Sequence, residues 1–439
     1  MSIPQTDFLA AEPSLAELLA ARPALKMHAQ DGLCFENVPL NAIADAFGTP
    51  VWVYGAATLR ARYGALKSAF AQAGLAPRLH YAVKANDHLA ILSLLREQGA
   101  GADVVSRGEF LRAQKAGIDP KDIVFSGVGK TAEDLRAALA QNIGQINVES
   151  PAELALLSAI AAAMGKTASI VLRMNPDVDA GTHAKITTGR ADNKFGVAAH
   201  EIPALYAHAA TLPGIQPIGL ALHIGSQILS PAPYAAAFGK AAALINHLRA
   251  AGQTVTTLDL GGGLGVGYRD EPGISLAAFA HTVRRATAEL GVSLILEPGR
   301  YLAAPAGLLL TSVILEKQNG AKRFCVLDAA MNDLIRPAMY DSYHAILPVS
   351  PVDFLAETTA ADIVGPVCET GDTFATGRAM PPLRPGARLA ILDAGAYGAV
   401  MSSTYNARPR AAAVLIDGTP KLITPRQAIE DLWSSEIVP

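Results

Sequence analysis

Short apolar runs alternate with amphipathic segments between about residues 50 and 310. The runs are LHYAVKA (79–85), ADVVS (102–106), DIVFS (122–126), QINVE (145–149), SIVLRMN (169–175), PIGLALHI (217–224), TVTTLDL (254–260) and VSLILEP (292–298). Continuous apolar runs separated by segments of helical period are typical of buried parallel strands. The pattern predicts an α/β fold with a (β/α)8 barrel. A doubly wound open sheet is the alternative, because periodicity cannot distinguish a closed sheet from an open one.

The pattern changes on both sides of this region. After residue 310, the runs RFCVLDAA, ARLAILDAG, AAVLID and PKLITPR alternate with turns rich in proline and glycine, which predicts a mostly β C-terminal domain. The segment GLCFENVPL near the N-terminus is also strand-like and could pair with that domain. We therefore predict an N-terminal segment (1–48) that packs with the C-terminal domain, a barrel (49–310) and a β-rich domain (311–439).

Composition and charge exclude several classes of function. The 36 basic and 39 acidic residues give a net charge of −3, which argues against binding to nucleic acid or to anionic membranes. Three distant cysteines suggest no disulfide framework, and the chain has no paired histidines or cysteines at metal-ligand spacing. No apolar run approaches the ~18 residues of a membrane span, and the first residues do not resemble a signal peptide. We expect a soluble, cytoplasmic protein without a metal.

Polar residues or glycines stand at the end of every predicted barrel strand. They are Lys84, Ser106, Ser126, Glu149, Arg173, His223, Gly261, Gly262, Gly263 and Glu297. In a parallel barrel these strand ends form one rim, where ligand chemistry is built. The onset of polarity at a strand end would explain any one of them alone, but the complete set predicts a site at this rim.

Lys84 allows two interpretations. An ammonium on a strand that is covered on both faces carries a desolvation penalty. The side chain could extend to solvent at the strand end. Alternatively, it could be an amine whose lowered pKa lets it form an imine with a carbonyl cofactor or substrate.

The other rim residues are equally open to two interpretations. Glu297 needs a cation, which could be Arg300 or a protonated pyridine nitrogen. His223 could be a satisfied core histidine or a neutral imidazole lying flat against an aromatic ring. The glycines at 261–263 could form a tight turn or close around a phosphate. Two nucleotide-binding signatures are incomplete, because SGVGKT (126–131) and GGGLGVG (261–267) each lack a required glycine. An NAD-binding oxidoreductase therefore has only the weak support of GGGLGVG.

Seven motifs occur in an order that identifies a family. They are YAVKAN (81–86), HIGSQ (223–227), GGGLG (261–265), EPGR (297–300), MNDLIRPAMYDSYH (331–344), CETGD (368–372) and GAYGAVMSSTYN (395–406). Together they resemble the fold type III (alanine-racemase-like) decarboxylases that use pyridoxal 5′-phosphate, most closely the diaminopimelate decarboxylase family, over roughly residues 35 to 430. The resemblance implies decarboxylation of meso-2,6-diaminopimelate to L-lysine and CO2, the last step of lysine biosynthesis. Thr370 departs from the family's usual serine, and the residues after HIGSQ lack a common acidic residue.

The resemblance also implies a role for each matched residue. Lys84 would hold the cofactor covalently, His223 would stack on its ring, and Glu297 would keep its pyridine nitrogen protonated. Further cofactor contacts, chiefly to the phosphate, would come from Ser226, Gly261, Gly262, Gly263, Gly299, Arg300 and Tyr397. The substrate would meet Arg300, Arg336 and Tyr340 at its distal carboxylate, Glu369 at its distal ammonium, and Tyr397. Cys368 would protonate the product carbanion, and it would reach with Glu369 into the partner's barrel, so the active unit would be a homodimer.

Two alternatives remain beside this function. The chain could decarboxylate a basic amino acid such as D-ornithine, D-lysine or arginine, or it could be a catalytically silent relative that regulates by forming dimers. Arg336 and Tyr340 favour a substrate with a distal carboxylate, which the basic amino acids lack. A silent relative would have little reason to retain the residues assigned to chemistry, which are Lys84, His223, Glu297 and Cys368.

Overall fold

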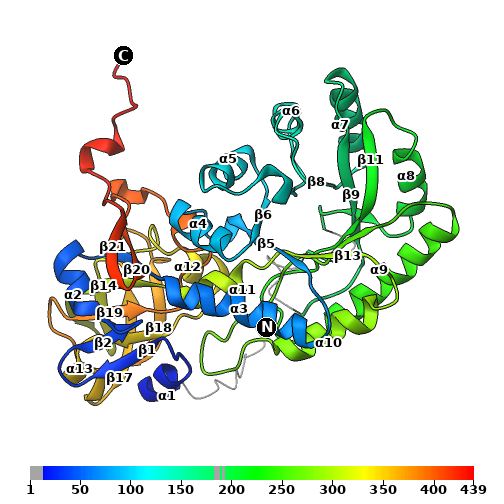
Figure 1. The fold of residues 1–439 in the computed structure, drawn as a ribbon. Helices are drawn as coiled ribbons and strands as arrows, with labels where there is room; N and C mark the ends of the chain where they lie inside the picture. Colours follow the sequence, from blue (N-terminus) through cyan, green and yellow to red (C-terminus); the bar gives the residue numbers. More distant parts are fainter. Residues whose placement is uncertain (1–12, 182–187, 190–192) are drawn as a thin grey trace, which may run out of the picture.

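A closed barrel of eight parallel strands dominates the computed structural model, which describes residues 13–181, 188–189 and 193–439 (Figure 1). The strands are β5 (Arg78–Ala82), β6 (Gly101–Val104), β7 (Ile123–Phe125), β8 (Gln145–Val148), β9 (Ala168–Asn175), β11 (Ile215–Ala221), β12 (Thr257–Asp259) and β13 (Ser293–Leu296). Each predicted run contributes one strand, and β13 pairs with β5 to close the ring. The barrel prediction is confirmed, because β8 also pairs with β9, so each of the eight strands has two neighbours, whereas an open sheet would leave two edge strands. A short strand, β10 (Val197–Ala198), pairs with β9.

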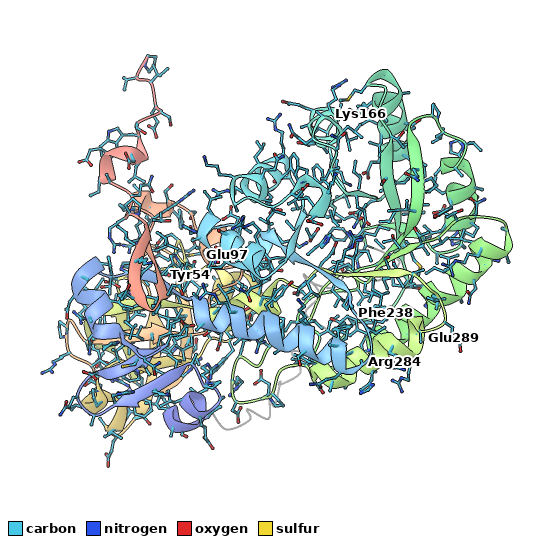
Figure 2. All side chains as sticks on the ribbon, viewed as in Figure 1. Tyr54, Glu97, Lys166, Phe238, Arg284 and Glu289 are labelled. Atoms are coloured by element: carbon cyan, nitrogen blue, oxygen red, sulfur yellow. The ribbon has the colours of Figure 1, made fainter. Side chains whose placement is uncertain are left out.

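Helices cover the outside of the barrel. They are α3 (Ala56–Gln72), α4 (Leu89–Glu97), α5 (Arg107–Lys115), α6 (Ala132–Ala140), α7 (Pro151–Ala163), α8 (Ile202–Ala209), α9 (Ala232–Ala250) and α10 (Leu276–Thr287). Several begin at a serine whose side chain accepts a backbone N–H in the first turn, as Ser150 does for α7 and Ser275 for α10. Between the last two helices, Phe238, which is labelled in Figure 2, packs against Phe279 with 6.3 Å between ring centroids.

The second domain is mostly β, as predicted. Its main sheet contains β4 (Val51–Gly55), β14 (Gly307–Asn319), β15 (Lys322–Leu327), β17 (Thr359–Val364), β18 (Thr373–Met380), β20 (Ala412–Asp417) and β21 (Thr419–Thr424). In addition, β19 (Arg388–Ile391) pairs with β14, and β16 (Ile346–Pro348) pairs with β19. A small sheet is formed by β1 (Leu25–His28), β2 (Gly32–Phe35) and β3 (Val38–Pro39). Short helices complete it, namely α1 (Leu15–Ala20), α2 (Leu40–Phe47), α12 (Arg336–Tyr340) and α13 (Pro351–Leu355), whereas α11 (Arg300–Ala303) follows the last barrel strand.

Strand β4 belongs to this second sheet. It pairs antiparallel with β14, where Tyr54 lies opposite Gly307, and parallel with β20, where Trp52 lies opposite Ala413. The boundary predicted at residue 49 assigned this strand to the barrel. The sequence misleads here because VWVYG is buried throughout, like a barrel strand, and burial does not reveal which sheet a strand joins. The other predicted boundaries stay predictions.

Residues 13–48, the described part of the N-terminal segment, pack on the β-rich domain, and the prediction for residues 1–12 lies outside the described residues. Leu33 and Phe35 share a buried cluster with Leu308 and Leu347, and in Figure 1 the blue N-terminal strands lie beside the orange C-terminal ones. Arg22 links this segment to both domains, since Nε donates to Asp393 at 2.7 Å and Nη2 donates to the carbonyl of Tyr268 at 2.6 Å. No helix in the described ranges is both long and apolar enough to cross a membrane.

His80, on β5, makes stability depend on pH. It is buried, and its Nδ1 has no hydrogen-bond partner among the described residues. Burial and the positive charge of Arg78 lower the pKa of His80 to about 4. On acidification, His80 takes up a proton near pH 6.5 in the unfolded chain but only near pH 4 in the folded chain. The stability that the fold has with a neutral His80 is therefore fully present above pH 6.5 and is lost as the pH falls toward 4.

We therefore expect His80→Leu to lose less stability on acidification than the unmodified protein. The difference between pH 6.5 and 4.5 should be on the order of 2 kcal/mol in the free energy of unfolding. Urea unfolding at a series of pH values measures it, with the exposed His28 changed to leucine as the control. Parallel pH curves for His80→Leu and the unmodified chain would show that His80 does not titrate with folding.

Candidate active site

A cavity of about 530 Å³ lies at the C-terminal ends of the barrel strands, where the barrel meets the β-rich domain. Seven predicted site residues line it: Lys84, His223, Ser226, Arg300, Arg336, Tyr340 and Tyr397. A second cavity of about 390 Å³ is lined by Lys84, His223 and Glu297, together with rim residues such as Ser126 and Arg173. Because Lys84 and His223 line both cavities, the two form one continuous site.

Lys84 follows β5 in a short 3-10 turn, and its Nζ donates to Oδ2 of Asp103 at 2.7 Å. Burial alone would lower the pKa of Lys84, but the negative charges of Asp103 and Glu297 outweigh it, and the pKa is raised. The expectation of a lowered pKa is therefore wrong for the unliganded site. The physical reason is Asp103, a fully buried carboxylate on the neighbouring strand β6.

His223 stands just beyond β11 and carries no charge. Its Nδ1 accepts the backbone N–H of Gly262 at 3.1 Å, so the ring proton resides on Nε2. Burial, followed by the charges of Arg173 and Lys84, lowers the pKa of His223 well below its usual value. The neutral imidazole needed for stacking on an aromatic ring is therefore present.

Glu297 stands just beyond β13 and is 7% exposed. Burial, then the charges of Asp103 and Asp259, raise its pKa well above the ordinary value. Arg300, the alternative partner, does not reach it. The guanidinium of Arg300 instead donates from Nη1 to the Tyr268 hydroxyl at 2.7 Å and from Nε to the Ser226 hydroxyl at 3.2 Å.

The three consecutive glycines form the tight turn that one interpretation required. Gly261 and Gly263 have φ of 66° and 99°, and a Cβ on Gly262 would lie 2.2 Å from the carbonyl oxygen of Glu297. The turn thereby holds the ends of β11, β12 and β13 close together. Contact of these glycines with a phosphate stays a prediction.

Gly299 and Tyr397, two further predicted phosphate-binding residues, pack closely against the residues on either side of Lys84. A Cβ on Gly299 would lie 3.1 Å from the side chains of Ala82 and Ala85. Tyr397, at φ 56°, donates its backbone N–H to the carbonyl of Ala85 at 2.7 Å. The Arg300 guanidinium lies 4.8 Å from the centre of the Tyr397 ring.

Arg300 and Arg336 present two buried guanidinium groups to the larger cavity, with 7% and 4% exposure. Neither has a carboxylate partner among the described residues. Arg336 is held by neutral groups, His344 at 2.9 Å and Ser342 at 3.3 Å. Buried guanidinium groups without a carboxylate favour an anionic ligand, because each presents a fork of N–H donors.

Tyr268 contacts both arginines and was not singled out from the sequence. It accepts from Arg300, and its ring centre lies 4.9 Å from the Arg336 guanidinium. We expect Tyr268→Phe to raise KM for a substrate with a distal carboxylate about tenfold, because a buried charged donor loses its partner, which costs about 1.5 kcal/mol or more. The value of kcat should change little, since the reacting atoms lie elsewhere.

Steady-state kinetics of Tyr268→Phe beside Tyr206→Phe checks this expectation. Tyr206 is buried and donates to the carbonyl of Thr254 at 2.6 Å, but it lines neither cavity of the site. A loss confined to kcat in Tyr268→Phe would contradict a role in holding the arginines.

Cys368 and Glu369 line neither cavity of this chain. They lie in the connection between β17 and β18, where Cys368 is exposed and donates its backbone N–H to Oδ1 of Asn406 at 2.9 Å. A hydrogen bond from Tyr405 to Glu369 raises the pKa of Tyr405. Their action in a partner's barrel stays a prediction.

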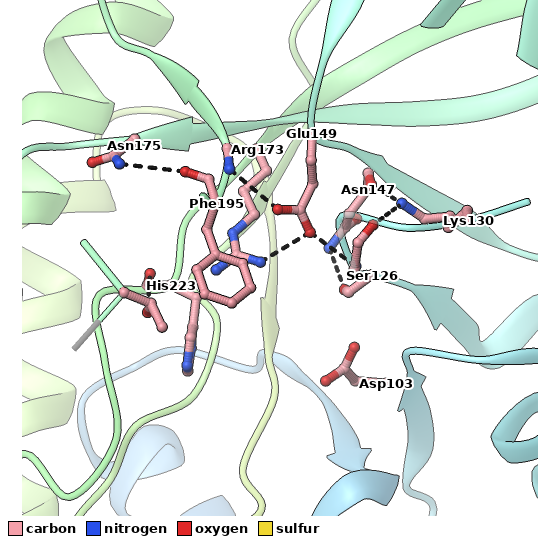
Figure 3. A network of polar contacts seen from close by, with 12 residues as sticks. Asp103, Ser126, Lys130, Asn147, Glu149, Arg173, Asn175, Phe195 and His223 are labelled. Carbon is pink, nitrogen blue, oxygen red and sulfur yellow. Dashed lines mark hydrogen bonds and ion pairs between the residues drawn. The ribbon is translucent and has the colours of Figure 1, made fainter. Parts of the chain in front are cut away.

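The remaining rim residues form a polar network inside the barrel (Figure 3). Arg173 pairs with Glu149 at 3.0 Å and lies 4.8 Å from the ring centre of Phe195. Asn147 donates to the hydroxyl of Ser126 at 3.0 Å. Ser106 is different, because it caps α5 by accepting the Glu109 N–H and lines neither cavity.

The family model for the pyridoxal-binding domain of pyridoxal-dependent decarboxylases matches residues 56–304. A closed barrel with this rim, joined to a β-rich domain, therefore defines a pyridoxal-dependent decarboxylase. Diaminopimelate decarboxylase of Zymomonas mobilis subsp. mobilis is 49% identical over 409 residues, which cover 92% of this chain and 96% of that protein. The chain belongs to the diaminopimelate decarboxylase family.

Solved structures agree in fold. The Helicobacter pylori diaminopimelate decarboxylase, complexed with L-lysine, has a TM-score of 0.87 and 41% identity, and the match covers 90% of this chain and 99% of that one. The M. jannaschii enzyme, also in complex with L-lysine, has a TM-score of 0.90 and 33% identity, with 95% and 99% covered.

Proposed function

We propose that this protein decarboxylates meso-2,6-diaminopimelate to L-lysine and CO2, with pyridoxal 5′-phosphate held by Lys84. The observation that carries the proposal is the pair of buried guanidinium groups, Arg300 and Arg336, on the cavity that Lys84 lines. A second carboxylate on the substrate would satisfy both groups. The basic amino acids lack that carboxylate and would leave the two positive charges buried without a counter-ion.

The residues at the rim fit the cofactor. Lys84 supplies an amine for its aldehyde, His223 a neutral flat ring for its ring, and Glu297 a buried carboxyl group for its ring nitrogen. When bound, pyridoxal 5′-phosphate supplies an electron sink for the charge left after CO2 departs. Ser226 and Tyr397 are proposed to hold its phosphate, together with the turns at Gly261–Gly263 and Gly299–Arg300.

The remaining steps fall to side chains of this chain and of a second copy. Oδ2 of Asp103 accepts a hydrogen bond from the Lys84 ammonium at 2.7 Å and so holds that side chain in position at the rim. Arg336 and Tyr340 orient the distal carboxylate, and Glu369 of a second copy would bind the distal ammonium. Cys368 of that copy would donate a proton to the product. Homodimer formation and a cytoplasmic location are parts of this proposal.

A substrate survey tests the function. Release of CO2 is measured with meso-, LL- and DD-diaminopimelate and with lysine, ornithine and arginine. We expect meso-diaminopimelate to be the preferred substrate and L-lysine to be the product. Preferential turnover of a basic amino acid would contradict the assignment, and no turnover of any of them by cofactor-loaded protein would favour a silent relative.

A further inference from the structure

Two acidic side chains face each other at the ends of neighbouring strands. Asp259 ends β12 and is fully buried, and Glu297 follows β13. Asp259 lies opposite Ile295 across the paired strands β12 and β13, and Glu297 follows two residues later on the same face. A hydrogen bond between the two carboxyl groups forms only if one of them carries a proton. Oε1 of Glu297 is buried and receives no N–H or O–H donor from the described residues. One proton shared between Asp259 and Glu297 would supply the missing donor for this pair of carboxyl groups.

Asp259 is the member of the pair that is built to carry the negative charge. Its carboxylate accepts the backbone N–H of Gly261 at 3.0 Å and the side-chain amides of Gln145 at 3.2 Å and Asn147 at 3.3 Å. Donors of this kind stabilise the ionised form of an acid. Glu297 has no comparable set, so the shared proton belongs mainly to Glu297.

The surrounding charges also favour retention of this proton. Lys84 from the turn after β5 and Asp103 from β6 pair with each other, and His223 from the end of β11 is neutral. Three carboxyl groups therefore surround a single ammonium. Burial, Asp103 and Asp259 together raise the pKa of Glu297 well above its ordinary value, which favours the protonated form of the pair.

We propose that Asp259 is a positioning residue that shares one proton with Glu297, and that this pair stores the proton which Glu297 later holds at the ring nitrogen of the cofactor. The proton at the ring nitrogen then comes from the carboxyl pair and not from solvent. Before binding, the proton lies between the two carboxyl groups. After binding, Glu297 shares it with the ring nitrogen, and Asp259 remains an anion held by its N–H donors. The inference rests on the proposed cofactor.

Proton uptake on cofactor binding tests the inference. In Asp259→Asn, the new amide donates a hydrogen bond to Glu297 and removes one negative charge, so Glu297 is ionised before binding. Apoprotein is mixed with pyridoxal 5′-phosphate at pH 7.5, and uptake is measured by calorimetry in buffers that differ in ionisation enthalpy. We expect the variant to take up one proton more per site than the unmodified protein. Equal uptake would overturn the inference.

Asp328→Asn serves as the matched control. Asp328 is a half-buried acid of the β-rich domain that accepts from Thr311 at 2.6 Å and lines neither cavity of the site. Its replacement should leave proton uptake unchanged. A purely structural loss in Asp259→Asn would weaken cofactor binding but would not add a proton to it.

The stability of the apoprotein gives a second, independent measurement. The folded pair holds a proton that the unfolded chain has released, so the free energy of unfolding falls as the pH rises above the ordinary carboxyl pKa. Asp259→Asn and Glu297→Gln should each flatten this dependence, and the double variant should flatten it no further, because the two residues share one proton. Additive effects would overturn the inference. Failure of the unmodified protein to bind the cofactor would refute the proposed function instead, and this stability test would still decide on the pair.

Discussion

Replacement of Lys84 by alanine is expected to give a folded protein without covalently bound cofactor and with decarboxylase activity lowered at least about 10³-fold, within the range for loss of a positioned acid–base group. Lys84 is the lysine that lines both cavities of the site, and its Nζ donates to the buried carboxylate of Asp103 at 2.7 Å. Alanine removes the amine and leaves Asp103 without its counter-ion.

Visible absorbance, borohydride trapping and peptide mapping measure this result. The unmodified protein should lose its visible absorbance on borohydride treatment and carry a pyridoxyl label on Lys84, and Lys84→Ala should carry none. Lys240→Ala is the control, since Lys240 donates to the carbonyl of Pro176 at 2.7 Å and lines neither cavity. A label on a different lysine of the unmodified protein would refute the assignment.

Mixing two inactive variants is expected to restore activity. Lys84→Ala and Cys368→Ala should each be nearly inactive alone, the second by about 10² to 10⁴-fold for a lost proton donor. Cys368 is exposed and lines neither cavity of its own chain, so we expect it to complete the site of a partner. Random subunit exchange makes about half of the dimers mixed, each with one intact site, so activity should approach about a quarter of the unmodified level if the sites are independent.

A double variant provides the control for the mixing experiment. Lys84→Ala mixed with the chain that carries both substitutions has no intact lysine in any dimer and should stay inactive. Mass labelling shows whether subunits have exchanged. Exchange without recovery of activity would mean that Cys368 acts within its own chain or not at all.

The sequence predicted the barrel because its strands and helices differ in apolar spacing, and the motifs placed Lys84, His223 and Glu297 on one rim. Asp103 and Asp259 were missed because each is a single acid inside an apolar strand. Only the pairing of adjacent strands around the barrel brings Asp103 beside Lys84. The direction of the Lys84 pKa was wrong for the same reason, since it depends on a neighbour 19 residues away in the chain.

Local spacing also failed where the backbone turns sharply. Arg300 follows Glu297 by three residues, which suggests a pair, but it begins α11 and its guanidinium is directed to Ser226 and Tyr268. Tyr268 lies outside the regular elements, where periodicity gives no signal. Its contacts with both arginines depend on the conformation of the loop after the glycines, which places Tyr268 on the cavity that Arg300 and Arg336 line.

Strands β4 and β14 form an antiparallel pair, and the whole barrel is the segment of chain that connects them. Tyr54 and Gly307 lie opposite each other on adjacent antiparallel strands, so the chain leaves the β-rich domain and re-enters it at almost the same point. The family model begins at residue 56 and ends at 304, which are nearly the ends of this segment. A short turn between these two strands would close the hairpin without stretching either one. The β-rich domain could then be produced by deleting the barrel segment and joining β4 directly to β14. Cutting the chain at a single position would release neither domain, because the β-rich domain is built from chain on both sides of the barrel.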